Sequence, residues 1–544
     1  MILVLIRFFG NSFHDALDTR LNPPKAAAWL CRVATVRRRS HAGRPLAEVA
    51  CQVLLENAND GFFNRNTSHL HRSKMNRSLL YLFPFLIHVP LLCYWVWTFY
   101  RTQTHEPLRQ WFWAALTLKC AAGIALGLLY LHHYPYRGDT FALFEESAVL
   151  SKLAFRQPDA YLGILLFDDF NGFATANLLL KNQPRAFFAA KLFSCINLFT
   201  FHNYWLTGLY CSLFSFWGFW RLATVLASFY PRTRTAAITA FLLFPSVVFW
   251  SSGVLKESIA MGCFTGILAI GLPLYFSTKR KDRQVFFRKN VFAHIKNHWK
   301  KGLCIVLFGW IVWQLKFYYL GALLPAALSL AGVFVLYGNY GISHGRVLLF
   351  WQILFFCAVF GAAPLLIRQI TGQSLLASIV ANHDATVTIS RPGTYVVFVS
   401  LLPTVRSFAA HFPLALWSGL FAPLPWQARN WLAFGATLEN AVLLGLAVLC
   451  LVKTCLSPKK KFRFFSSPVG LPLSKDTILT RLLVRVAVLY IVSLAVVLAF
   501  SSPNFGALAR YKVGFLPFLV YILLAGLPAN PQKTNNRNEC ERMF

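Results

Sequence analysis

Long apolar runs separated by short basic loops are the feature that most constrains the fold of this chain. A helix that crosses the hydrocarbon core of a membrane needs about 20 apolar residues. Of the 544 residues, 57% are apolar and only 13% are charged, whereas a soluble domain carries about 25% charged residues. Candidate spans lie at about residues 78–100, 111–131, 204–228, 235–251, 254–277, 302–315, 317–337, 346–368, 434–452, 481–500 and 511–528.

These runs predict an all-α polytopic membrane protein with about 10–13 transmembrane helices. Two shorter apolar stretches, 186–201 and 395–420, contain Pro and Arg or His. We expect such stretches to form interfacial helices in outer loops. No fixed-period repeat is visible, which argues against a solenoid or an evident inverted-repeat transporter.

Residues 1–74 differ in character from the rest of the chain. They include Arg37-Arg38-Arg39 and no run long enough to cross a bilayer, whereas Met75 is followed almost directly by the first span. We therefore expect Met75 to be the true start and 1–74 to be a non-native extension; a disordered basic arm is the alternative. Residues 75–530 are predicted to form one multi-span domain, and 531–544 a cytoplasmic tail.

The positive charge is unevenly distributed along the loops. Lys and Arg number 53 against 19 Asp and Glu, a net charge of +34. In so apolar a chain this excess excludes a nucleic-acid binder with a solvated basic face and indicates loops at a membrane surface. Loops with most Lys and Arg face the cytoplasm, which places 232–234, 279–301 and 453–463 there. The segments 132–203, 251–253, 369–433 and 501–510 are then predicted to lie outside.

Acidic residues gather in the first predicted outer loop. Six of the 19 lie between positions 139 and 169. Asp139 directly follows a predicted span, where a carboxylate can stay hydrated and still face a cavity at membrane level. Such an acid is a candidate general base toward a hydroxyl, or a candidate ligand of a divalent cation. Asp159 and Asp168 are interpreted as solvated loop acids.

A charged pair follows a predicted helix break on the same side. Pro245 and Gly253 interrupt two apolar runs, and Lys256-Glu257 opens the second run. Charges at membrane depth are costly and are usually paired or functional. Lys256 is a candidate to pair with Glu257 or Asp139, or to bind a phosphate with the free N–H groups of the helix start. A purely structural ion pair is the alternative.

Further cations lie on the predicted outer side, against the orientation rule. Arg391 and Arg429 belong to the segment 369–433, and Arg510 and Lys512 open the last span. Snorkelling to the membrane surface is one explanation. An anionic ligand is the other, and we favour it, with Arg429 as a phosphate or sugar contact.

No nucleotide-binding loop, metalloprotease signature or serine-hydrolase elbow occurs in the sequence. Most of the cysteines lie singly inside apolar runs, and no CxxC pair occurs. A metal or redox centre built from thiolates therefore has no support. His383-Asp384 supplies too few ligands for zinc.

In chain order, four motifs resemble bacterial integral-membrane glycosyltransferases of the C-type (GT-C) fold. They are Arg-Gly-Asp-Thr at 137–140, Phe-Pro-Ser with Phe-Trp-Ser-Ser-Gly ahead of Lys256-Glu257, Pro-Trp-Gln-Ala-Arg-Asn at 425–430, and Asn-Phe-Gly with Arg-Tyr-Lys at 504–512. The resemblance covers about residues 79–530. It implies a multi-span enzyme that takes a sugar from a polyprenyl-phosphate carrier on the outer side of the membrane.

The resemblance also assigns roles. It implies that Asp139 is the catalytic base. The second acid that the family often has next to the base is not adjacent to Asp139 here, and Glu145 and Glu146 follow six and seven positions later as candidates for its role. Lys256, Glu257, Arg391, Arg429, Arg510 and Lys512 are the expected substrate- and phosphate-binding residues. A divalent cation, Mg or Mn, held by Asp139 and Glu146 is left open, and no other cofactor is expected.

The predicted function is transfer of a sugar to a glycan or lipid acceptor during cell-surface glycan assembly. The expected place is the bacterial inner membrane, with the site facing the periplasm or cell exterior and membrane lipids around it. The alternative within the same chemistry is an O-antigen or exopolysaccharide repeat-unit polymerase centred on arginines. The alternative from another class is a lipid-linked oligosaccharide transporter, for which Lys119 and Lys316 are the only tempting buried charges in the helices.

Overall fold

The protein was analysed as a computed structural model, which describes residues 67–102, 108–133, 138–170, 178–277, 291–340, 345–372, 374–428, 431–456 and 473–527. The chain divides into two units, Met1–Tyr81 and Leu82–Phe544. Of the first unit only the beginning of helix α4 is described, and the predicted boundary at Met75 falls within that helix. The predicted tail 531–544 lies outside the described residues.

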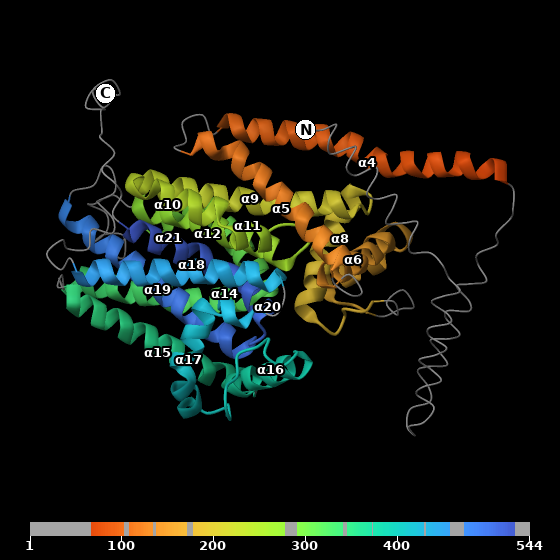
Figure 1. Ribbon diagram of the computed structural model, residues 1–544. Helices are drawn as coiled ribbons and strands as arrows, with labels where there is room; N and C mark the ends of the chain where they lie inside the picture. The colour runs from red at the N-terminus through yellow and green to blue at the C-terminus, as the bar shows by residue number, and fades with distance from the viewer. Residues whose placement is uncertain are drawn as a thin grey trace, which may run out of the picture. The chain divides into compact units, whose positions relative to one another are not determined.

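Every regular element in the described residues is helical (Figure 1). The first half of the chain forms α4 (Thr67–Thr102), η2 (Arg109–Trp111), α5 (Phe112–His132), α6 (Gly138–Arg156), α7 (Pro158–Phe167), α8 (Pro184–Thr200), α9 (Tyr204–Phe229), η5 (Pro231–Thr233), α10 (Arg234–Ile238), η6 (Thr239–Leu243), α11 (Pro245–Trp250) and α12 (Lys256–Ser277). The second half forms α14 (Val291–Tyr340), α15 (Gly345–Thr371), α16 (Leu375–Ile389), α17 (Val405–Phe421), η7 (Pro425–Gln427), α18 (Trp431–Leu456), α19 (Leu473–Ser501), α20 (Phe505–Tyr511), η8 (Lys512–Gly514) and α21 (Leu516–Gly526).

Eight of the described helices are long and apolar enough to cross a membrane, or nine if the bent pair α20–η8 and α21 forms one span. The class predicted from the sequence, an all-α multi-pass membrane protein, is therefore confirmed. The described residues thus contain fewer candidate spans than the 10–13 predicted. The run 235–251 is divided into α10, η6 and α11 because Pro245 cannot continue the preceding helix, and 186–201 and 395–420 contain only the 17-residue helices α8 and α17.

Helix α14 is interrupted at Lys316, between the two apolar runs that the sequence separates there. This residue has φ −148° and ψ 63°, outside the helical range. Before the break, Phe308 lies against Gly266 in the middle of α12. After it, Phe334 packs against Tyr230, as does Leu272 near the end of α12. Because Lys316 itself reaches Glu257 at the start of α12, the chain runs along α12 towards its first turn and then back.

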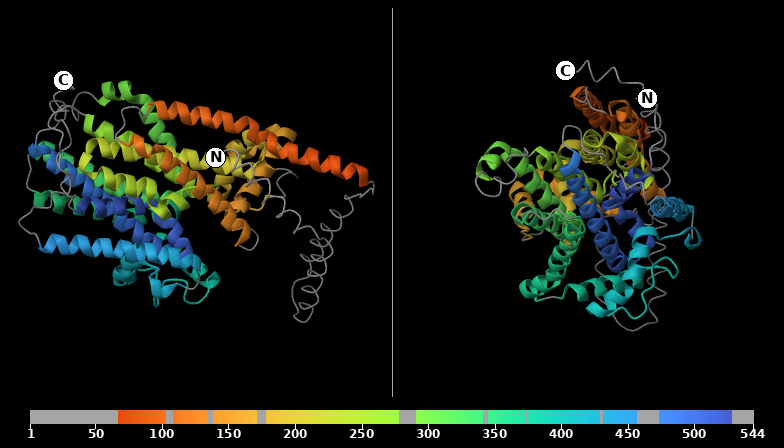
Figure 2. Two further views of the ribbon diagram at one scale, coloured as in Figure 1. Left: turned by 45° about the horizontal axis from the view of Figure 1, so that its top comes forward. Right: turned by 90° about the vertical axis from the view of Figure 1, so that its left-hand side faces the viewer.

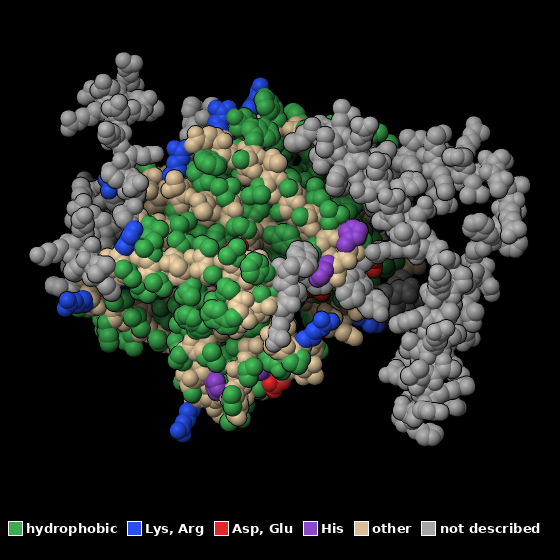
Figure 3. All heavy atoms as spheres, in the orientation of Figure 1, with side chains coloured by type: hydrophobic (Ala, Val, Ile, Leu, Met, Phe, Trp, Pro, Cys, Tyr) green, Lys and Arg blue, Asp and Glu red, His purple; other side chains and the backbone are tan. Residues whose placement is uncertain are grey.

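One end of the helical bundle in the larger unit is basic. Three hydrogen bonds join helix ends there: Tyr230 to Thr480, Thr233 to Tyr521, and Arg485 to the Gly345 carbonyl. The described cations at this end, which we call the basic end, include Arg232, Arg234, Arg346, Arg481 and Arg485. The face in Figure 3 is largely apolar, and several Lys and Arg side chains lie at its left-hand margin. This is the distribution expected of a bundle surrounded by lipid.

The opposite end of the bundle is formed by the first turns of α6, α9 and α12 and by the break in α14. Phe141 stacks on Tyr204, with ring centroids 4.3 Å apart, so the start of α6 lies on the start of α9. Asn203 begins α9, because its side-chain oxygen accepts hydrogen bonds from the N–H groups of Trp205 and Leu206. Figures 1 and 2 show α9 and α12 side by side along the bundle.

The close approach of α9 and α12 depends on glycine. A Cβ on Gly218 would meet the Gly262 carbonyl oxygen and the Thr265 hydroxyl at less than any normal contact distance. In lipid, helices associate through such close backbone packing because burial of apolar surface adds little. We expect Gly218→Ala to lower the free energy of unfolding by about 1–3 kcal/mol, measured as thermal unfolding in detergent. Gly271→Ala, on α12 with no neighbour within 4 Å, is the control and should not lower it.

Candidate functional site

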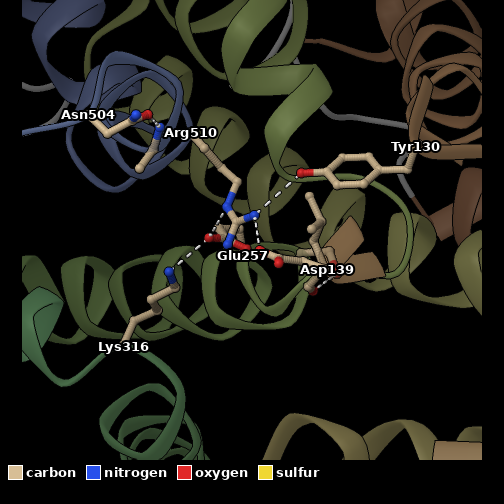
Figure 4. Close-up of polar contacts among 9 residues, drawn as sticks. Tyr130, Asp139, Glu257, Lys316, Asn504 and Arg510 are labelled. Carbon is tan, nitrogen blue, oxygen red and sulfur yellow. Dashed lines mark hydrogen bonds and ion pairs between the residues drawn. The ribbon is translucent and has the colours of Figure 1, made fainter. Parts of the chain in front are cut away.

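Arg510 lies at the centre of an ion cluster at this second end of the bundle (Figure 4). Asn504 begins the short helix α20 by accepting hydrogen bonds from the N–H groups of Gly506 and Ala507. The helix delivers the guanidinium of the buried Arg510 between two carboxylates. Its Nε donates to Glu257 Oε1 at 2.9 Å, and its Nη1 donates to Asp139 Oδ2 at 2.8 Å. The same Nη1 lies 3.4 Å from the Tyr130 hydroxyl.

Lys316 joins the cluster from the break in α14. Its Nζ lies 2.8 Å from Glu257 Oε1, the oxygen that also accepts from Arg510. The ammonium group is 3.8 Å from the centre of the Tyr511 ring, a favourable cation–π arrangement. Glu257 therefore holds two cations with one oxygen, while its Oε2 is buried without a hydrogen-bond partner among the described residues.

The cluster carries more positive than negative charge. Lys256 is half-buried beside Glu257 and close enough to Lys316 and Arg510 to repel them. It forms no hydrogen bond or ion pair with the described residues. Three cations thus face two carboxylates, Asp139 and Glu257. In a medium of low dielectric constant an uncompensated cation is costly, so the cluster is suited to an anionic ligand.

Exposure differs sharply between the members of the cluster. The Glu257 side chain is 0% exposed, those of Lys316 and Arg510 are 5% and 8% exposed, and that of Asp139 is 61% exposed. Asp139 is thus the acid that a molecule from outside the bundle can reach. A solvent-accessible carboxylate beside buried cations can accept a proton from a hydroxyl while the cations stabilise a neighbouring anion.

Of the residues predicted from the sequence, the structure brings together Asp139, Lys256, Glu257 and Arg510. It places the other described ones, Glu145, Glu146, Arg391 and Lys512, elsewhere. Both oxygens of Glu146 accept backbone hydrogen bonds, from Leu179 and Leu180 at 3.0 Å. Lys512 donates to the carbonyls of Leu420 and Ala422, at 3.1 and 2.5 Å. Glu145 on α6 and Arg391 after α16 are exposed, and Arg429 lies outside the described residues.

Glu146 is not placed to share a metal ion with Asp139, because its carboxylate is engaged with the backbone of residues 179–180. Nor do the described residues contain any group of three or more His, Cys, Asp or Glu side chains that could hold a metal ion. The cations of the cluster itself oppose a bound cation at Asp139. The geometry thus favours an anion as the ligand.

Tyr130 is the member of the cluster that the sequence did not point to, and Lys316 was considered only as a buried charge under the transporter alternative. Lys316 stands alone between two apolar runs, and this isolation marks it as a buried charge, but the sequence does not show which acid it meets. Tyr130 lies in the last turns of α5, where an aromatic residue at the membrane surface is ordinary. Lys119, which was considered together with Lys316, lies apart from the cluster and donates to the Ser251 hydroxyl at 2.5 Å.

No family model matches this chain, and neither a curated protein nor a solved structure matches it. The helices alone therefore define its class, which is that of multi-pass, all-helical membrane proteins.

Proposed function

We propose that this protein is a membrane glycosyltransferase of the GT-C type, which moves a sugar from a polyprenyl phosphate to a hydroxyl of a glycan or lipid acceptor. The observation that carries the proposal is the contact of the accessible Asp139 carboxylate with the buried, net-positive cluster of Arg510, Lys316, Glu257 and Lys256. This arrangement sets a proton acceptor beside an anion site. Both are needed when a hydroxyl displaces a phosphate.

The proposed reaction uses the activation that the donor already carries. The acceptor hydroxyl oxygen attacks the anomeric carbon of the sugar, and the bond from that carbon to the phosphate oxygen breaks. The polyprenyl phosphate leaves with the bonding electron pair, stabilised by Arg510 and Lys256. The hydroxyl proton passes to Asp139. No ATP is consumed, in keeping with a sequence that lacks a nucleotide-binding loop.

The distribution of charge supports an outward-facing site. The basic end of the bundle carries Arg232, Arg234, Arg346, Arg481 and Arg485, and the cluster lies at the other end of α9 and α12. Because basic helix ends remain in the cytoplasm, we propose that the cluster faces the periplasm or cell exterior from the inner membrane. Lipid-linked sugars for cell-surface glycans would reach it there.

Purified protein supplied with native lipid-linked sugars in detergent tests the proposal. We expect release of polyprenyl phosphate together with a glycosylated acceptor. Detergent removes the second compartment, so a transporter would leave the donor intact. Absence of turnover with every lipid-linked donor and acceptor tried would contradict the proposed transfer.

One observation favours transport of a lipid-linked anion as a second candidate. Lys316 is a buried cation at the break of a membrane helix and is paired with Glu257, as in transporters whose binding sites lie at broken helices. Uptake of a lipid-linked saccharide into vesicles, without cleavage of the donor, would support this candidate. Within transferase chemistry, the repeat-unit polymerase remains an alternative. Such an enzyme is expected to be centred on arginines, and an arginine, Arg510, contacts both acids of the cluster.

A further inference from the structure

The three nitrogen atoms of the Arg510 guanidinium differ in whether they already have a hydrogen-bond partner. Its Nε–H is taken by Glu257, and Nη1 donates to Asp139 and faces Tyr130. Nη2 has no partner among the described residues. A guanidinium binds a phosphate most strongly with two parallel N–H groups, either Nε with Nη2 or Nη1 with Nη2. Each of these pairs includes one nitrogen that a carboxylate already holds.

Only one of the two carboxylates is placed to give way. Glu257 is fully buried and also neutralises Lys316, so its departure would leave two buried cations without their acid. Asp139 is mostly exposed, and water can solvate it once it leaves Arg510. It occupies the first turn of α6 directly after Gly138, whose φ of 55° marks a turn of the backbone. The Nη1–Nη2 pair is therefore the one that an anion can gain.

We propose that Asp139 is a built-in competitor of the anionic ligand: a phosphate monoester or diester takes the Nη1–Nη2 edge of Arg510 by displacing the Asp139 carboxylate. This inference rests on the proposed function and adds its regulation. While Asp139 is paired with Arg510, its Oδ2 accepts the guanidinium N–H and is not free to accept the proton of a hydroxyl. Arrival of the donor phosphate breaks the pair and frees the carboxylate next to the bound sugar. The base becomes available only after the donor has bound, so binding is ordered, donor before acceptor.

The test measures binding of a short-chain prenyl phosphate to the full chain in nanodiscs. If Asp139 competes with the phosphate, Asp139→Asn removes the competing charge and leaves only a neutral hydrogen bond to be displaced, so this variant should bind the prenyl phosphate about tenfold more tightly than the wild type. This result is opposite to that expected of an ordinary binding residue, whose loss weakens binding. Asp159→Asn removes the same charge from the same outer region, at an exposed position of α7, and should leave the affinity unchanged.

A second variant separates displacement from a general gain in positive charge. Arg510→Lys keeps the charge but lacks the two parallel N–H groups of a guanidinium. The gain in affinity from Asp139→Asn should therefore largely vanish in this background. Equal or weaker binding by Asp139→Asn, alongside binding by the wild type, would overturn the displacement and leave the proposed function standing. The displacement would also be overturned if the tenfold gain in affinity for the prenyl phosphate persisted in the Arg510→Lys background or appeared with Asp159→Asn. No binding by the wild type or any variant would overturn both.

Discussion

Asp139→Asn protein is expected to keep its fold and to lose turnover of lipid-linked donor by about 10²–10⁴-fold, the usual contribution of a general base. The amide has the size of the carboxylate and can still accept a hydrogen bond from Arg510, so the cluster retains its geometry. It cannot take the proton of an attacking hydroxyl. The mostly exposed position of the side chain means that the substitution buries no new polar group.

The measurement is release of polyprenyl phosphate by purified protein, with thermal unfolding recorded on the same sample. Asp159→Asn is the matched control, with turnover and unfolding temperature unchanged. Loss of turnover together with tighter binding of the prenyl phosphate would locate the defect in the chemical step. Retained turnover in Asp139→Asn would remove the base from the mechanism and favour the arginine-centred polymerase.

Most of the membrane-spanning helices were predictable from the sequence because each must bury its backbone polar groups in its own hydrogen bonds and present about 20 apolar residues to lipid. The stretch 204–228, for example, corresponds to α9 at Tyr204–Phe229. The run 235–251 was not predictable in the same way. Its apolar composition suits a span, but Pro245 divides it, and apolar content alone does not show that the pieces are too short to cross.

The candidate site was predictable in part, and for a specific reason. Asp139, Glu257 and Arg510 are charged residues at the ends of apolar runs, where charge is costly enough to require a partner. Which partners meet depends on packing between helices more than 250 residues apart in the sequence, as with Arg510 and Glu257. Glu146 shows the limit of the same reasoning. It lies in the same acid-rich loop, yet it is buried and bound to backbone N–H groups, a role that no motif indicates.

Glu257→Gln is expected to destabilise the protein more than the removal of any exposed acid, by about 3–5 kcal/mol of unfolding free energy. Its oxygen Oε1 accepts from both Arg510 and Lys316, and all three side chains are buried. With glutamine in its place, three cations face Asp139 alone. Loss of one partner of a buried pair leaves the remaining charge without compensation, and here two charges are affected.

The double variant Glu257→Gln with Lys316→Met should recover much of this loss, because one acid and one cation are removed together and Arg510 keeps Asp139 as its partner. Thermal unfolding in one detergent, followed by tryptophan fluorescence, compares the single variants, the double variant and Asp159→Asn. The last of these removes an exposed acid of α7 and should unfold like the wild type. If the double variant were as unstable as Glu257→Gln, the cost would come from the shape of the site and not from unpaired charge. Recovery in the double variant would instead show that the instability of Glu257→Gln comes from the unpaired charge of Lys316, which lies at the break of α14.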